Sequence, residues 1–164
     1  MYTVIVADDE EEIRRGIVRK VRWEELGFRV VGEAENGAEA LEMVEKLEPD
    51  LLLTDIRMPF LSGIELARSV REVLPTVQIA FLSGFDDFSY AQQAIQYNIV
   101  SYMLKPISAA ELEEELRNIK AVMDRKFEEF KEMGKTILFV SHDLSSIGKY
   151  CDRVVLLNKG EKLA

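Results

Sequence analysis

The chain has 164 residues, of which 48% are hydrophobic and 31% are charged, enough for one α/β domain plus an appendage but too few for two full domains. With 30 acidic against 21 basic residues, the formal net charge of −9 opposes a nucleic-acid-binding or anionic-membrane surface, because the basic residues are not segregated. The single cysteine, Cys151, excludes an internal disulfide, and one cysteine with one histidine excludes a usual zinc site.

The N-terminal run Met1–Val6 leads straight into acidic residues, without a basic lead or a cleavage site. No apolar run approaches the ~20 residues that a membrane span needs. We therefore expect a soluble protein in the reducing cytoplasm, with no membrane partner.

Short apolar runs alternate with longer amphipathic stretches, a rhythm typical of βα units around a mostly parallel sheet. Each run is rich in Val, Ile, Leu or aromatic residues, as strands covered on both faces are. The predicted strands are Thr3–Ala7, Phe28–Glu33, Leu51–Thr54, Gln78–Leu82 and Ser101–Leu104. Five such units predict an α/β fold with a doubly wound parallel sheet.

The stretches between the strands carry helical spacing. Apolar residues repeat every three or four positions in three of them, at Ile13, Ile17 and Val21, at Leu41, Val44 and Leu47, and at Leu112, Leu116 and Ile119. Helix starts are marked by capping boxes, in which a short polar side chain and a glutamate three residues later bind each other's exposed amides. The pairs are Asn36 with Glu39, Ser62 with Glu65, and Ser108 with Glu111.

Polar residues follow four of the predicted strands. Asp8 and Asp9 follow the first strand, Asp55 the third, Ser83 the fourth and Lys105 the fifth. In a doubly wound sheet, ligands bind beyond the carboxyl ends of the strands. Each residue also has a structural explanation: the first two acids can favour a helix N-terminus, the third can cap a turn and the lysine can be solvated. Their joint placement favours a site.

Three carboxylates packed together repel one another, so they must raise a pKa or recruit a cation. Mg²⁺ suits two or three acids plus a backbone carbonyl such as that of Arg57. With the charge neutralised, Asp55 can attack a phosphoryl donor in line, while Lys105 and the Mg²⁺ stabilise the oxygens of the transferring group. Ser83 would donate a hydrogen bond to the attached phosphoryl group.

Four runs resemble the response-regulator receiver family closely in order, spacing and residue type. They are Val6–Glu10, Leu53–Pro59 with Gly63, Leu82–Gly84, and Tyr102–Ile107, within residues 1–123 of the 164. The resemblance implies a flavodoxin-like fold. By matching motifs it makes Asp55 the phosphoacceptor, Asp8 and Asp9 the metal-binding acids, Ser83 the switch hydroxyl, Tyr102 the switch aromatic and Lys105 the phosphoryl-contacting lysine.

Three further runs look like the branch of receivers that precede an AraC-type DNA-binding domain. They are Trp23–Phe28, Gly32–Gly37 and Ser83–Phe88. One loop departs mildly from the family pattern, because Phe60–Ser62 replaces the common Gly-Met-Asp filling before Gly63. This departure would alter access to Asp55 but not its chemistry.

The resemblance also implies a two-state switch. A phosphoryl group on Asp55 would draw Ser83 toward it, and the vacated space would let Tyr102 turn inward. This would change the surface formed by the helix before the fifth strand, that strand and the last receiver helix, where receivers usually dimerise, so the resemblance allows a homodimer. The alternative for Tyr102 is a half-buried strand aromatic.

The donor would be the phosphohistidine of a sensor histidine kinase or a small acyl phosphate, and the chain would not itself be an enzyme beyond slow self-dephosphorylation.

Beyond residue 123 another α/β pattern begins. It predicts a continued charged helix at Arg125–Met133, a strand at Thr136–Val140, a helix at Asp143–Tyr150 and a strand at Arg153–Leu157. Gly134-Lys135-Thr136 is not a phosphate-binding P-loop, because Glu129 stands where that motif needs glycine and the run precedes its strand.

Residues Gly134–Leu144 and Tyr150–Leu157 resemble the late part of an ABC-transporter ATPase, with His142 at the switch-histidine position. The Walker A and signature motifs are missing, so we expect no ATPase activity. These features suggest a chimera of a receiver, 1–123, and an ABC-ATPase-like fragment, 124–164. In it, Thr136–Val140 would extend the sheet beside Ser101–Leu104. The alternatives are a loosely attached tail, and a recombined or engineered fold without signalling output.

Overall fold

The computed structural model describes residues 1–84, 95–132, 157–158 and 161–162. The chain divides into two compact units, Met1–Arg125 and Lys126–Ala164. Within the described residues, no helix is both long enough and apolar enough to cross a membrane.

The first unit is built on one five-stranded sheet in which every neighbouring pair is parallel. The strand order is β2-β1-β3-β4-β5, which places β3 at the centre between β1 and β4. The strands are β1 (Tyr2–Ala7), β2 (Phe28–Ala34), β3 (Leu51–Thr54), β4 (Gln78–Ser83) and β5 (Ser101–Leu104). All five predicted strands are confirmed, with ends that differ by one residue at most.

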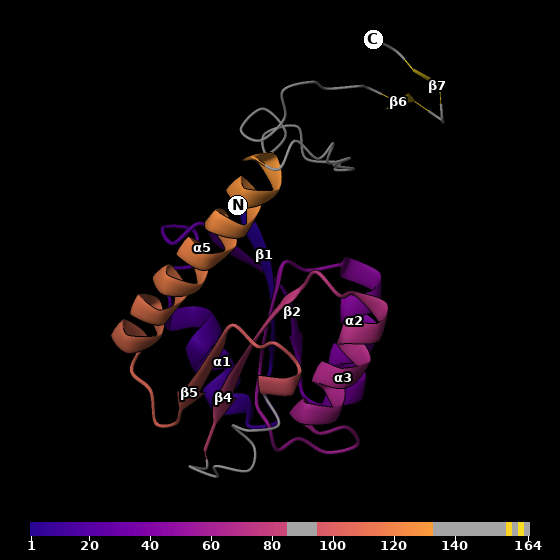
Figure 1. Ribbon diagram of the computed structural model, residues 1–164. Helices are drawn as coiled ribbons and strands as arrows, with labels where there is room; N and C mark the ends of the chain where they lie inside the picture. Colours follow the sequence, from indigo (N-terminus) through magenta and orange to yellow (C-terminus); the bar gives the residue numbers. More distant parts are fainter. Residues whose placement is uncertain (85–94, 133–156, 159–160, 163–164) are drawn as a thin grey trace. The chain divides into compact units, whose positions relative to one another are not determined.

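Among the described residues, helices cover both faces of this sheet (Figure 1). Helices α1 (Glu11–Lys20) and α5 (Ala109–Glu132) pack on one face, and α2 (Gly37–Leu47) and α3 (Gly63–Val73) on the other. The flavodoxin-like doubly wound fold is therefore confirmed. The helix expected before β5 lies largely in residues 85–94, outside the described residues.

Strand β1 shows why the apolar runs are continuous. Val4 and Val6 pack with α1 and α5, whereas Ile5 and Ala7 pack with α2 and α3. Successive side chains of a strand point to opposite faces, so a strand with helices on both sides needs apolar residues at every position. Val4 and Ile5 are both 0% exposed. Burial of such side chains contributes about 1.5–3 kcal/mol each.

The capping boxes at Ser62 and Ser108 form as predicted, with reciprocal hydrogen bonds to Glu65 and Glu111. Asn36 differs in part. Its side chain accepts a hydrogen bond from the Glu39 backbone N–H at 2.9 Å, but the Glu39 carboxylate accepts from the N–H of Glu35 at 2.8 Å. The backbone of Asn36 is extended, and the glutamate reaches past it to the preceding amide.

Helix α5 continues without a break to Glu132, in agreement with the helical pattern predicted after residue 123. In the second unit, β6 (Leu157–Asn158) and β7 (Glu161–Lys162) pair antiparallel with each other. Of the predicted strand Arg153–Leu157, only Leu157 lies in the described residues, and it belongs to β6. Thr136–Val140 lies outside the described residues, as does His142, so the proposed extension of the sheet stays a prediction.

Candidate functional site

The order of the strands reverses between β1 and β3, where a crevice forms beyond their carboxyl ends. The ladder hydrogen bonds continue into the residues that follow each strand. The backbone N–H of Asp8 donates to Ala34 O at 3.0 Å, and that of Asp55 donates to Ala7 O at 2.8 Å. These bonds hold the two aspartates side by side at the crevice.

Asp8, Asp9 and Asp55 form one acidic cluster. A carboxylate oxygen of each lies within 4.8 Å of the others. Asp8 and Asp55 are 1% and 6% exposed, whereas Asp9 is exposed. The structure therefore brings together the three acids that the sequence placed after the first and third strands.

Lys105 reaches this cluster from the end of β5, where its backbone N–H donates to Ser83 O at 2.7 Å. Its Nζ lies 2.7 Å from Asp8 Oδ2, 3.2 Å from Asp55 Oδ2 and 3.4 Å from Glu10 Oε1. The Lys105–Pro106 peptide bond is cis. One ammonium group is thus shared among three carboxylates.

The pKa values of these groups record the balance between burial and charge. Burial raises the pKa of both Asp8 and Asp55, and it outweighs the opposing effect of Lys105. Burial also lowers the pKa of Lys105, but the hydrogen bonds and charges of the two aspartates outweigh it, so that pKa is raised. The lysine therefore stays protonated, while the carboxylates carry their charge at a cost.

The two carboxylates differ in how their oxygens are satisfied. Asp8 Oδ1 accepts from the Glu10 N–H at 2.9 Å, and Asp55 Oδ1 accepts from the Ile56 N–H at 2.6 Å. Among the described residues no donor is aimed at Asp8 Oδ2 in hydrogen-bond geometry, although the Lys105 ammonium lies beside it. A buried carboxylate oxygen that lies beside two more acids and one shared ammonium group fits a hard divalent cation.

The loop after β3 returns to the backbone of the site. The Gly63 N–H donates to Ile56 O at 2.8 Å, and a Cβ at Gly63 would overlap the carbonyl oxygen of Asp55. Only glycine permits this close approach. A cleft of about 680 Å³ adjoins the loop and is lined by Asp9, by Ile56, Arg57, Met58 and Pro59 of the loop, and by Ser62, Ile64 and Glu65 at the start of α3.

Ser83 and Tyr102 lie on the neighbouring strands β4 and β5. Ser83 is 1% exposed and opposes Leu104 in the strand register. Tyr102 is half-buried and meets Phe81 edge-on, with ring centroids 6.4 Å apart. The alternative of a half-buried strand aromatic describes this packing, and the inward turn of Tyr102 stays a prediction.

Arg14, Glu10 and Thr54 also contact the site, although their positions in the sequence did not predict it. Arg14 is buried on α1, donates to the backbone carbonyl of Asp8 at 2.5 Å and approaches Glu33 Oε2 to 3.8 Å. Thr54 Oγ1 donates to the carbonyl of Asp55 at 2.9 Å. A signal for Arg14 existed, because it lies three residues before Ile17, on the apolar face of its helix.

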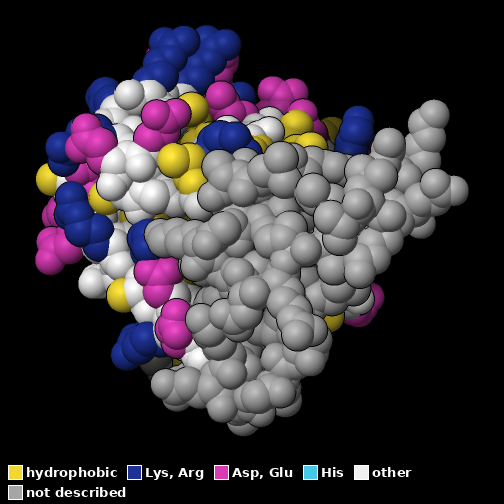
Figure 2. Space-filling model, turned by 90° about the horizontal axis from the view of Figure 1, so that it is seen from above, with side chains coloured by type: hydrophobic (Ala, Val, Ile, Leu, Met, Phe, Trp, Pro, Cys, Tyr) yellow, Lys and Arg dark blue, Asp and Glu magenta, His cyan; other side chains and the backbone are white. Residues whose placement is uncertain are grey.

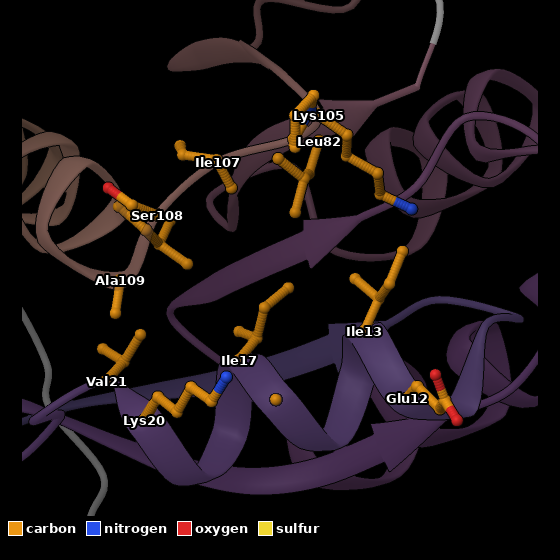
Figure 3. Close-up of a pocket in the computed structure, with 13 residues that line it drawn as sticks. Glu12, Ile13, Ile17, Lys20, Val21, Leu82, Lys105, Ile107, Ser108 and Ala109 are labelled. Atoms are coloured by element: carbon orange, nitrogen blue, oxygen red, sulfur yellow. The ribbon is translucent and has the colours of Figure 1, made fainter.

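An apolar groove of about 450 Å³ lies between α1 and the connection from β5 to α5. Figure 3 shows Ile13 and Ile17 rising from α1 toward Leu82 and Ile107. Lys105 lines the same groove, and its ammonium group points away from Ile107. Lys105 therefore borders both the acidic cluster and this open, mostly apolar groove.

The sequence profile of the response regulator receiver domain matches residues 4–117. The chain is a member of this family. Its receiver is similar to the uncharacterized transcriptional regulatory protein YesN of Bacillus subtilis, with 39% identity over 77% of this chain and 34% of YesN. It is also similar to the transcriptional regulatory protein HptR of Staphylococcus aureus, with 36% identity over 69% of this chain and 44% of HptR. The chain thus spans less than half the length of these relatives.

Solved structures give the same result. The receiver domain of AraT from Geobacillus stearothermophilus superimposes with a TM-score of 0.72 at 38% identity, over 76% of this chain and 97% of that one. A two-component transcriptional regulator AraC from Clostridium phytofermentans gives a TM-score of 0.69 at 30% identity, over 76% and 97%. Phosphorylation-driven switching is the general function of such receivers. None of these matches supports the ABC-ATPase-like interpretation of residues 124–164.

Proposed function

We propose that this receiver accepts a phosphoryl group on Asp55 from the phosphohistidine of a sensor histidine kinase or from a small acyl phosphate. One observation carries the proposal. The Asp55 carboxylate is buried, its Oδ1 is held by the Ile56 N–H, and its Oδ2 lies 3.2 Å from an ammonium group shared with Asp8. A carboxylate oxygen held in this way has a defined direction for in-line attack.

Asp8, Asp9, Asp55 and the backbone carbonyl of Arg57 would hold a Mg²⁺ ion. The closeness of the three carboxylates and the raised pKa of Asp8 and Asp55, caused by burial, support this set. When bound, Mg²⁺ would offset the excess negative charge and coordinate phosphoryl oxygens.

In the transfer, an oxygen of Asp55 forms a bond to phosphorus while the bond from phosphorus to the donor's imidazole nitrogen, or to its acyl oxygen, breaks. Lys105 offsets the negative charge of the transferring oxygens. Ser83 then donates a hydrogen bond to the new phosphoryl group, and Tyr102 turns inward in response. The product is an acyl phosphate, which water hydrolyses slowly; the protein has no other reaction of its own.

The switch would change the surface formed by the helix expected before β5, by β5 and by α5, through which a homodimer would form. Figure 2 shows basic and acidic side chains interspersed over the described surface in that view, with no broad basic patch there. This distribution within the described part of that face, together with the net charge of −9, supports a receiver that does not itself bind nucleic acid.

Acetyl phosphate with Mg²⁺ tests the proposal. Intact-mass measurement should find one added phosphoryl group on the wild-type chain and none on Asp55→Asn. Asp124→Asn, an aspartate on α5 that binds the Tyr2 hydroxyl, serves as the matched control and should be labelled like the wild type. Chelation of Mg²⁺ should abolish labelling. Labelling that survives in Asp55→Asn would contradict the assignment.

A further inference from the structure

We propose that Phe60 is an aromatic anchor for a protein phosphodonor, so that it selects a phosphohistidine-bearing partner over a small acyl phosphate. The inference rests on the proposed phosphorylation of Asp55. It adds a residue that touches the donor protein but takes no part in the chemistry.

The Phe60 side chain is 89% exposed, more than any other large hydrophobic side chain among the described residues. The next is Ile95 at 76%, and the others range from 42% to 54%. An exposed phenylalanine does not stabilise the fold of the isolated chain. Aromatic side chains are, however, enriched among the residues that dominate protein–protein binding.

The backbone at Phe60 is also strained. Its φ is +66°, and the Leu61 N–H donates to Pro59 O at 2.8 Å across it. This three-residue turn with a positive central φ is the rare, strained form of the γ-turn. Glycine would adopt it freely, yet a phenylalanine stands there. A strained residue that is also an exposed aromatic points to a contact outside the chain.

The loop on both sides of Phe60 is held firmly. Gly63 binds Ile56, and Ser62 shares its capping box with Glu65. On the other side, a Cβ at Gly37 would overlap the carbonyl oxygen of Leu61, so the start of α2 packs directly on the loop. The backbone is therefore already ordered, and only the phenyl ring must be immobilised when a partner binds.

The position of the loop indicates what this partner is. Asp55 is 6% exposed, so only a slender group can reach it. A protein that delivers a phosphohistidine must stop at the rim of the cleft, where Arg57, Pro59 and Ser62 flank Phe60. Acetyl phosphate is small enough to pass this rim. The partner is therefore a phosphohistidine protein with an apolar recess beside its histidine.

The experiment compares two donors on the same variants. The protein donor is the ³²P-loaded cytoplasmic fragment of the histidine kinase that, in a panel of bacterial kinases, phosphorylates the wild-type chain fastest; the small donor is acetyl phosphate. Both variants remove the phenyl ring. Phe60→Gly keeps the loop conformation and relieves its backbone strain, whereas Phe60→Ala retains that strain. Val73→Ala, at an exposed position at the end of α3, is the matched control.

We expect both Phe60 variants to lower the rate of transfer from the kinase about tenfold and to leave acetyl phosphate labelling unchanged, with Val73→Ala like the wild type for both donors. Unchanged transfer from the kinase would overturn the inference. So would an equal fall with both donors, because Phe60 would then shape the Asp55 pocket. A wild-type chain labelled by acetyl phosphate but by no kinase would overturn it too. Failure of wild-type labelling by acetyl phosphate would instead count against the proposed function.

Discussion

Two clusters of charged side chains hold carboxylates away from water in this receiver, and their charges are balanced in opposite ways. In the first, the acidic site, Asp8 and Asp55 share the ammonium group of Lys105. In the second, Glu113 on α5 accepts from Arg22 Nη2 at 2.6 Å and from Arg22 Nε at 3.1 Å. Arg117 lies 3.7 Å from the same glutamate, so there two cations serve one acid.

The pKa values of the carboxyl groups follow this difference. The side-chain and backbone hydrogen bonds from Arg22 lower the pKa of Glu113 to about 2. At the acidic site, burial raises the pKa of Asp8 and Asp55 despite Lys105. The side chain of Arg22 is 58% exposed whereas that of Lys105 is 9% exposed, so the guanidinium keeps much of its hydration.

The cluster of Arg22, Glu113 and Arg117 is a structural ion pair, whereas the acidic site is prepared for a ligand. A carboxylate with enough cations and water around it is stable by itself. A buried group of carboxylates that is short of positive charge gains most from a further cation, and such groups mark functional sites.

The largest expected effect is that of Lys105→Met. Loss of the shared ammonium leaves Asp8 and Asp55 buried without a cation, which should lower the free energy of unfolding in metal-free buffer by about 3 kcal/mol. The pKa of both carboxyl groups would rise further, so the deficit should be large at pH 7 and shrink as the pH falls and they protonate. Urea denaturation measures it. Arg117→Met, which removes an exposed helix pair, should cost under about 0.5 kcal/mol; equal losses would remove the distinction between the clusters.

Asp8→Asn should have the opposite sign. The amide can still accept from the Glu10 N–H, while one buried charge disappears, so the free energy of unfolding without metal should rise by about 1 kcal/mol. A raised carboxyl pKa makes the wild-type chain lose stability as the pH rises through that pKa, and this loss should be smaller in the variant. Thermal melts with and without Mg²⁺ measure both effects. Mg²⁺ should stabilise the wild type and not the variant, and a variant still stabilised by Mg²⁺ would contradict the metal site.

Glu113→Gln should destabilise the receiver at neutral pH, in contrast to Asp8→Asn. The effect should be smaller than that of Lys105→Met, because Arg22 is largely exposed and solvent screens the pair. A lowered carboxyl pKa contributes stability above the ordinary value of 4.5, and that contribution is lost as the pH falls toward 2. Melting temperatures from pH 7 to pH 2 should therefore converge for the variant and the wild type. A gap that stays constant with pH would show that the charge of Glu113 is not its source.

Phe60→Gly should give the smallest change, a gain of about 0.5 kcal/mol in the free energy of unfolding. Glycine relieves the positive φ of +66° at the rim of the acidic site, although it adds entropy to the unfolded chain. Phe60→Ala keeps the strain and should show no gain. Chemical denaturation of the two variants side by side measures the difference, and equal stabilities would mean that the turn is not strained.

The sequence alone determined the five strands and the positions of the site's main residues. Doubly covered strands must be apolar at every position, so runs such as Leu51–Thr54 are unmistakable. The carboxyl ends of parallel strands all lie at the same edge of the sheet. The order of residues along the chain therefore predicted that Asp8, Asp55 and Lys105 would meet. The capping boxes at Ser62 and Ser108 were predictable because their partners lie within one helical turn.

Tertiary structure alone decided how the charges are shared. Arg22 and Glu113 are 91 positions apart, and no local spacing links them. The ion pair of Asp8 with Lys105 likewise joins elements distant in sequence, which local patterns do not record. Periodicity and motif order predict which residues reach an edge of a sheet. The distances at that edge, and hence the pKa values, arise only when the helices and loops pack around it.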